Sequence, residues 1–197
     1  MILRFTSWLR LLAPYLAVCL FWVGWSQAWL AILTYHVQIL LWYRFGRWIR
    51  ARPRENRWAC YLLFVCIMAG PMVYYLLPQL AVVPIRHWLQ QYRLDGVSLI
   101  LMIPYFGLLH PILEQLHWDR LRSEKGWAHP LFAGYHVIVL YQLLPASWLL
   151  LIFVGLCALS WLWKTAGNTQ RARMYCMFSH IAADLGIMIA VYLLMYG

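Results

Sequence analysis

Long apolar segments separated by short basic loops organise this sequence. Residues 8–43 form the first apolar segment, which is too long for one upright membrane span of about 20 residues. A tight hairpin that turns near Gly24-Trp25-Ser26-Gln27 would divide it into two short spans. One span followed by a helix in the membrane interface is the alternative. The pattern therefore predicts a series of hydrophobic helices.

The remaining apolar segments each have about the length of a single span. An amphipathic stretch, residues 79–93, is expected to lie in the membrane interface. Pro104 and Pro111 fall inside one apolar segment, where a kink or an unwound turn is expected because proline breaks the helical hydrogen-bond ladder. The predicted fold class is an all-α integral membrane protein, a polytopic helical bundle with at least five spans, or seven with the hairpin. The single spans cover residues 58–77, 97–117, 130–144, 147–163 and 175–195.

Composition agrees with a membrane protein and argues against a soluble one. Hydrophobic residues make up 64% of the 197 residues, and only 11% are charged. A soluble chain of this size has too much surface relative to its volume to hide that much apolar area. The 13 Trp and 13 Tyr also suit the headgroup level of a bilayer. One transmembrane domain, residues 1–197, is expected.

The formal net charge of +10 is spread between the apolar segments rather than over one polar face, which argues against nucleic-acid binding. Alternating spans place three basic loops on one side of the membrane and leave only Arg86 and Arg93 on the other. By the positive-inside rule these three loops face the cytoplasm and the C-terminus lies outside. Placing Arg4 and Arg10 in the cytoplasm as well requires the hairpin, hence seven spans. The three loops hold twelve positive residues: Arg44, Arg47, Arg50, Arg52, Arg54, Arg57, Arg120, Arg122, Lys125, Lys164, Arg171 and Arg173.

Ionisable side chains in hydrocarbon are costly, so those predicted to lie within spans are candidate functional residues. Glu114 is expected within a turn of the cytoplasmic end of its span. His136 and His180 are expected about two turns, or roughly 10 Å, from the same face. Asp184 follows His180 by four residues and shares its helical face. Three helices thus bring these groups to a similar depth, which predicts a shared site, with unrelated hydrogen bonds between helices as the alternative.

The other histidines are weaker candidates. His36 is expected to be either a hydrogen-bonded core histidine or an interfacial one. The remaining four are expected near water, where interfacial placement explains them. They are His87, His110, His117 and His129.

Three short motifs in residues 97–196 resemble those of the CAAX protease and bacteriocin-processing family, a group of intramembrane glutamate proteases. The first, Pro111-Ile-Leu-Glu114-Gln115-Leu-His-Trp118-Asp119-Arg120, corresponds to the family pattern EExxxR after a proline. Gln115 replaces the second glutamate, and Asp119 stands where the family has arginine, with Arg120 one residue late. The second motif is Phe132-x-x-x-His136 and the third is His180-x-x-x-Asp184, against the family's HxxxN/D.

The resemblance implies an intramembrane endopeptidase that needs no cofactor and no metal. Glu114 would be the general base that activates water, with assistance from His136. His180 and Asp184 would stabilise the oxyanion of the tetrahedral intermediate, or Asp184 would instead orient His180 as an acceptor.

By the same resemblance, residues 1–95 would be accessory helices and residues 96–197 the catalytic core. The substrate would be a membrane-associated or lipidated peptide. It would be cleaved within the lipid bilayer at a cytoplasm-facing site, and the expected location is a bacterial inner (plasma) membrane.

Three alternatives remain open. A non-catalytic relative, such as a membrane scaffold or an immunity protein, is favoured by the absence of the second glutamate and of the family arginine. A metal-dependent membrane enzyme is the second alternative, although the sequence contains no HExxH motif, and a transporter is the third. The candidate zinc or iron ligands are His110, Glu114, His117, His136, His180 and Asp184.

Overall fold

The computed structural model of the chain describes residues 2–42, 59–167 and 169–197. Every regular element in these three ranges is helical, which confirms the predicted all-α class. Large hydrophobic side chains cover the outside: the exposed fractions of Leu41 and Tyr75 are 76% and 68%. Such an apolar exterior is stable when lipid chains cover it.

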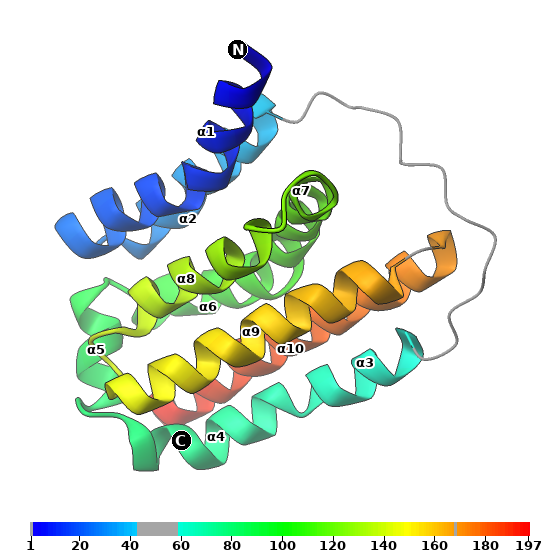
Figure 1. Cartoon of the computed structure of the whole chain (residues 1–197). Helices are drawn as coiled ribbons and strands as arrows, with labels where there is room; N and C mark the ends of the chain where they lie inside the picture. Colours follow the sequence, from blue (N-terminus) through cyan, green and yellow to red (C-terminus); the bar gives the residue numbers. More distant parts are fainter. Residues whose placement is uncertain (1, 43–58, 168) are drawn as a thin grey trace.

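The N-terminal segment forms the expected helical hairpin along one side of the bundle (Figure 1). Helix α1 (Ile2–Ala17) continues into a π-helical segment, η1 (Val18–Gly24), and α2 (Ala28–Trp42) runs back beside it. The turn between them contains Ser26, whose backbone has a φ of +51°. The predicted break in the 8–43 segment is therefore confirmed.

Four helices in the described ranges are long and apolar enough to cross a membrane: Ala59–Leu80, Gly96–Glu124, Ala146–Ala166 and Gln170–Tyr196. Three shorter apolar helices accompany them: Trp8–Gly24, Ala28–Trp42 and Ala128–Leu140. Helix length thus supports an integral membrane protein without fixing the number of spans at seven. After the hairpin, the elements are α3 (Ala59–Ile67), α4 (Ala69–Leu80), α5 (Ile85–Gln91), α6 (Gly96–Pro104), η2 (Tyr105–Leu109), α7 (His110–Glu124), α8 (Ala128–Leu140), α9 (Ala146–Ala166) and α10 (Gln170–Tyr196).

Helix α10 lies at the centre of the bundle, in contact with α3, α4, α6, η2, α7 and α9. Two glycines allow these close contacts. A Cβ on Gly70 of α4 would lie 2.9 Å from the backbone of Gly186, and one on Gly107 of η2 would lie 2.8 Å from Cα of Leu185. Small residues let helix backbones approach closely in membranes. The π-helix η2, between Pro104 and Pro111, is the disturbance expected at those prolines, and it places Gly107 against α10.

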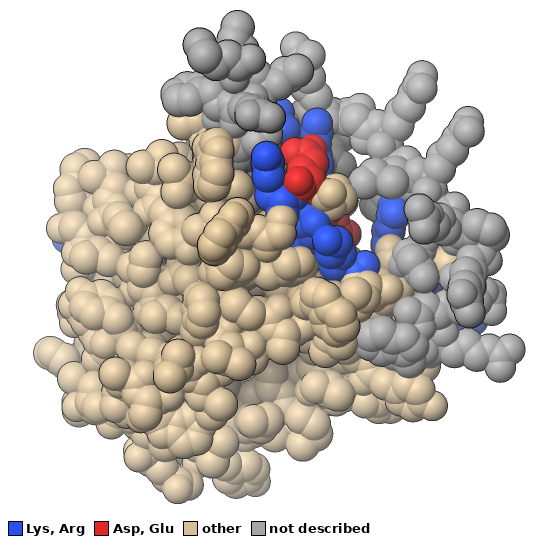
Figure 2. Space-filling model, viewed as in Figure 1, with Lys and Arg blue, Asp and Glu red and all other residues tan. Residues whose placement is uncertain are grey.

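The two ends of the bundle differ in character. At one end, the segment before α5 contacts the connection between α8 and α9, since Val82 donates from its backbone N–H to Leu143 O (2.9 Å). Arg86 of α5 donates to Met195 O (2.6 Å) near the end of α10. At the other end, charged side chains gather on the visible face (Figure 2). The described basic residues at that end are Arg10, Arg120, Arg122, Lys125, Lys164, Arg171 and Arg173, whereas the six arginines at 44–57 lie outside the described residues.

The loop predicted directly after His117 is wrong. Helix α7 continues to Glu124, so Arg120 and Arg122 occupy its last turns. Arg120 is exposed to solvent, as a loop residue would be. Arg122 is buried, with an exposure of 1%.

Candidate functional site

Glu114 is the centre of a buried cluster of ionisable side chains. It is fully buried, and Nε2 of His180 and Nε2 of His110 lie 3.2 and 3.6 Å from its Oε2. His180 Nε2 is within hydrogen-bond distance of the carboxylate, but among the described residues neither carboxylate oxygen accepts a hydrogen bond of good angular geometry. Glu114 lies ten residues before Glu124, the end of α7, rather than in the last turn of its helix as expected.

Helix α10 supplies the next two members of the cluster. His180 is buried, and its Nε2 lies 3.5 Å from Oδ2 of Asp184, one turn further along the same helix. The imidazole stacks on the indole of Trp163 from α9, with ring centroids 4.5 Å apart. Nε2 of His180 therefore faces two carboxylates, those of Glu114 and Asp184, while aromatic stacking holds the ring.

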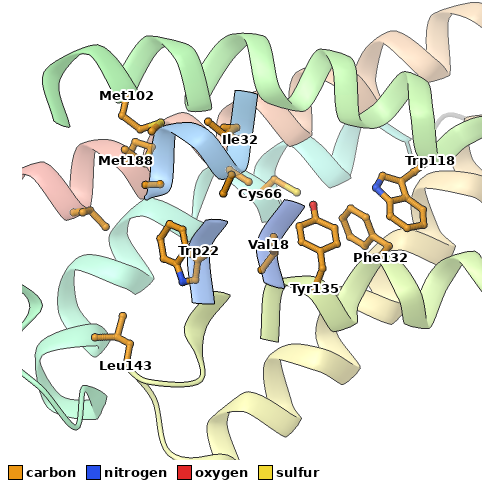
Figure 3. Packing of buried hydrophobic residues seen from close by; sticks show 14 of the residues in the cluster. Val18, Trp22, Ile32, Cys66, Met102, Trp118, Phe132, Tyr135, Leu143 and Met188 are labelled. Carbon is orange, nitrogen blue, oxygen red and sulfur yellow. The ribbon is translucent and has the colours of Figure 1, made fainter. Parts of the chain in front are cut away.

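His136 lies beside this cluster rather than in direct contact with Glu114. Its Nδ1 donates to Phe132 O at 2.8 Å, which leaves Nε2 with the lone pair when the ring is neutral. The Phe132 ring is 4.9 Å from the His136 ring and 6.4 Å from the His180 ring, so it lies close to both imidazoles. Figure 3 shows Phe132 and Tyr135 side by side near Trp118.

Two histidines that the sequence ranked low belong to the buried cluster. His110 is 3% exposed, so the expectation that it lies near water is wrong. Its Nδ1 lies 2.9 Å from Nε2 of His36, and Nδ1 of His36 lies 2.7 Å from Oη of Tyr105. His36 is thus a hydrogen-bonded core histidine, one of the two expected outcomes. One signal was available in the sequence, because His110 precedes Glu114 by the same four residues that separate His180 from Asp184.

The last two turns of α7 carry a second polar cluster, centred on Arg122. Its Nε donates to Ser160 Oγ at 2.8 Å, and its Nη1 donates to Asp119 Oδ1 at 3.3 Å and Gln115 Oε1 at 3.4 Å. Gln115 also donates to Asp119 at 3.0 Å. His129 Nδ1 lies 2.9 Å from Ser160 Oγ, which ties α8 to the same group.

Aromatic rings separate the two clusters. The Arg122 guanidinium lies over the ring of Phe132 at 4.9 Å and over that of Trp163 at 5.6 Å. The same two rings contact His180. Arg122 forms no ion pair with Glu114 within 4.0 Å, as judged from these described side chains.

The chemistry open to the first cluster is proton transfer and the stabilisation of charge. A carboxylate with free lone pairs can accept a proton, and imidazole N–H groups beside it can donate to a developing negative charge. Over the described ranges, no set of three or more His, Cys, Asp or Glu side chains has an arrangement that could hold a metal ion.

The fold and the cluster define a class: an all-helical membrane protein with a buried group of one glutamate, one aspartate and several histidines. No family model, curated protein or solved structure matches the chain.

Proposed function

We propose that this protein is an intramembrane endopeptidase in which Glu114 acts as the general base that activates water. The observation that carries the proposal is the burial of the Glu114 carboxylate and the contacts that it makes. It is fully buried, lies between two imidazoles and accepts no hydrogen bond of good angular geometry on either oxygen among the described residues. Burying a carboxylate in this way costs folding free energy, which favours a functional reason for it.

The neighbouring side chains have suitable chemistry for peptide hydrolysis. His136 would assist Glu114 through its free Nε2, because its Nδ1 is engaged by Phe132 O. His180 would donate from Nε2 to the oxyanion of the tetrahedral intermediate. Asp184 contacts the same nitrogen at 3.5 Å, which supports the second of its two expected roles, the orientation of His180.

The departures from the CAAX protease and bacteriocin-processing pattern are offset locally. The family motif has a glutamate and an arginine where this chain has Gln115 and Asp119. The same two turns nevertheless contain one carboxylate and one guanidinium, since Asp119 pairs with Arg122 at 3.3 Å. Gln115 hydrogen-bonds with both, as a donor to Asp119 and an acceptor from Arg122. This compensation favours an active enzyme over a non-catalytic scaffold.

In the proposed topology the three shorter apolar helices complete seven spans. The connection at 141–145 joins α8 and α9 at the end of the bundle where Leu143 contacts Val82, opposite the basic end. The basic end would face the cytoplasm of a bacterial inner (plasma) membrane by the positive-inside rule. A membrane-associated or lipidated peptide would reach Glu114 from that side.

The test is the substitution Glu114→Gln, which keeps the size of the side chain and removes the base. The matched control is Glu124→Gln in the same helix, because Glu124 is exposed and pairs only with Arg120 in the described structure. Each purified variant is mixed in nanodiscs with a solubilised bacterial membrane-protein fraction, and new peptide termini are measured by mass spectrometry.

Wild type and Glu124→Gln should generate the same new termini, and Glu114→Gln should lower their rate of appearance by about 10²–10⁴-fold. Equal cleavage by wild type and Glu114→Gln, with both proteins folded, would exclude Glu114 as the base.

A further inference from the structure

Tyr105, His36 and His110 form a linear series of contacts that ends at Glu114. Tyr105 Oη meets His36 Nδ1 at 2.7 Å, and His36 Nε2 meets His110 Nδ1 at 2.9 Å. Nε2 of His110 then faces Oε2 of Glu114 at 3.6 Å, beyond direct hydrogen-bond distance. The two imidazoles are also stacked, with centroids 5.2 Å apart and planes 26° apart. Both nitrogens of each ring are therefore committed to a defined neighbour.

A neutral imidazole carries its proton on one nitrogen and a lone pair on the other. If Tyr105 donates to Nδ1 of His36, then His36 must carry its proton on Nε2 and donate it to Nδ1 of His110. His110 in turn must carry its proton on Nε2, where the N–H faces the carboxylate of Glu114. The opposite direction would make Tyr105 the acceptor and would turn a bare lone pair of His110 toward Glu114.

The charge of Glu114 and the Tyr105 hydroxyl, at the two ends of the series, together favour one of these two directions. At 3.6 Å an N–H dipole attracts an ionised carboxylate, whereas a nitrogen lone pair repels it. Little water can screen this contact, because the exposed fractions of His36 and His110 are both 3% and that of Glu114 is 0%. Only the direction that starts at the Tyr105 hydroxyl satisfies every ring nitrogen and also favours the ionised base.

We propose that Tyr105 and His36 are positioning residues that hold His110 in the tautomer with its proton on Nε2, directed at Glu114. Since His36 belongs to α2, the N-terminal hairpin completes the site instead of serving only as an accessory element. The consequence for catalysis rests on the proposed function of Glu114, whereas the tautomer of His110 rests only on Glu114 being ionised.

The first measurement is ¹⁵N NMR of histidine-labelled protein in nanodiscs, which distinguishes protonated from unprotonated ring nitrogens. His110 and His36 should both be Nε2–H tautomers in the wild type. His36→Gln should preserve the His110 tautomer, because the glutamine amide N–H can donate to His110 Nδ1 in place of the Nε2–H of His36. His36→Phe keeps a planar ring without a donor, and it should give a mixture of tautomers at His110. A Nδ1–H or doubly protonated His110 in the wild type would overturn the proposal.

A second variant covers the case in which His36→Phe does not fold. Tyr105→Phe removes one hydroxyl and should give mixed tautomers at His36. The matched control, Tyr92→Phe, removes a hydroxyl that donates to Gln142 and should change neither histidine. If the ¹⁵N signals of His36 are unchanged in folded Tyr105→Phe protein, Tyr105 does not set the tautomer of His36 and the proposal is overturned.

The catalytic consequence is measured on a synthetic peptide chosen from the cleavage sites of the wild-type protein. His36→Phe should lower kcat about tenfold, the size expected for one lost orienting hydrogen bond, with KM unchanged, and His36→Gln should restore most of it. Equal rates for both variants would remove the positioning role from catalysis. If the wild type cleaves nothing, the proposed function fails, and the NMR result still decides the tautomer.

Discussion

Replacing Arg122 should destabilise the protein more than replacing any other basic side chain that the structure describes. It is the only buried Lys or Arg among those residues, with an exposure of 1%. Its neighbour Arg120 lies two positions earlier in α7 but is 49% exposed and pairs with Glu124 at 3.2 Å. Arg122→Met and Arg120→Met therefore make the same chemical change on one helix in two different environments.

The magnitude follows from the contacts that Arg122 makes. Breaking a buried ion pair by removal of one partner typically costs about 3–5 kcal/mol, because the other charge loses its compensation. Asp119, the remaining partner, is 37% exposed and can be partly hydrated, which favours the lower end of that range. Lost contacts with Ser160 and the Phe132 ring add to the cost, while relief of burying a cation subtracts from it. We expect about 3 kcal/mol for Arg122→Met and less than about 1 kcal/mol for Arg120→Met.

The assay is reversible unfolding in mixed detergent micelles, followed by tryptophan fluorescence at several denaturing-detergent fractions. Arg122→Lys adds a control for charge, since lysine keeps the cation without the planar fork that reaches Ser160 and Asp119 together. It should fall between wild type and Arg122→Met. Free energies of unfolding for Arg122→Met and Arg120→Met that agree within about 0.5 kcal/mol would refute the assignment of Arg122 as a buried structural cation.

Two further predictions concern topology and metal content. In a cysteine-free background, Lys125→Cys and Gly197→Cys should react with a membrane-impermeant thiol reagent from opposite sides, because they lie at opposite ends of the bundle; labelling from one side would exclude the seven-span topology. The purified protein should contain no stoichiometric zinc or iron if Glu114 acts directly on water; about one bound metal ion per chain would favour the metal-dependent alternative for the cluster of His110, Glu114 and His180.

Much of the helical organisation could be predicted from the apolar pattern, since a membrane span must satisfy its backbone within one helix. The hairpin break followed from the length of the 8–43 segment. A kink or an unwound turn was predicted at Pro104 and Pro111, and the structure has the π-helix η2 between them. The end of α7 was misplaced because arginines were taken to mark a loop. The sequence could not show that Asp119, Ser160 and two aromatic rings make a helical, buried Arg122 stable.

The sequence could predict the candidate site only where its residues lie on one helix or within one motif. The i, i+4 spacing placed His180 and Asp184 together, and burial at similar depth placed Glu114 near them. The contribution of His36 depends on how the hairpin packs against α7, which no local spacing encodes. Tyr105 is the first residue of η2 and His36 belongs to α2, so the pair lies on two different helices and no spacing along one helix would identify it.

The separation of Arg122 from Glu114 has a chemical consequence for a buried base. A direct salt bridge would occupy the carboxylate lone pairs that must accept a proton from water. Glu114 and Arg122 are instead eight residues apart on α7, with Phe132 and Trp163 against the guanidinium. The guanidinium reaches back to Gln115, so it attracts the Glu114 carboxylate without pairing with it. The cation can thus offset part of the cost of burying Glu114 while its two oxygens stay free of a direct salt bridge to Arg122.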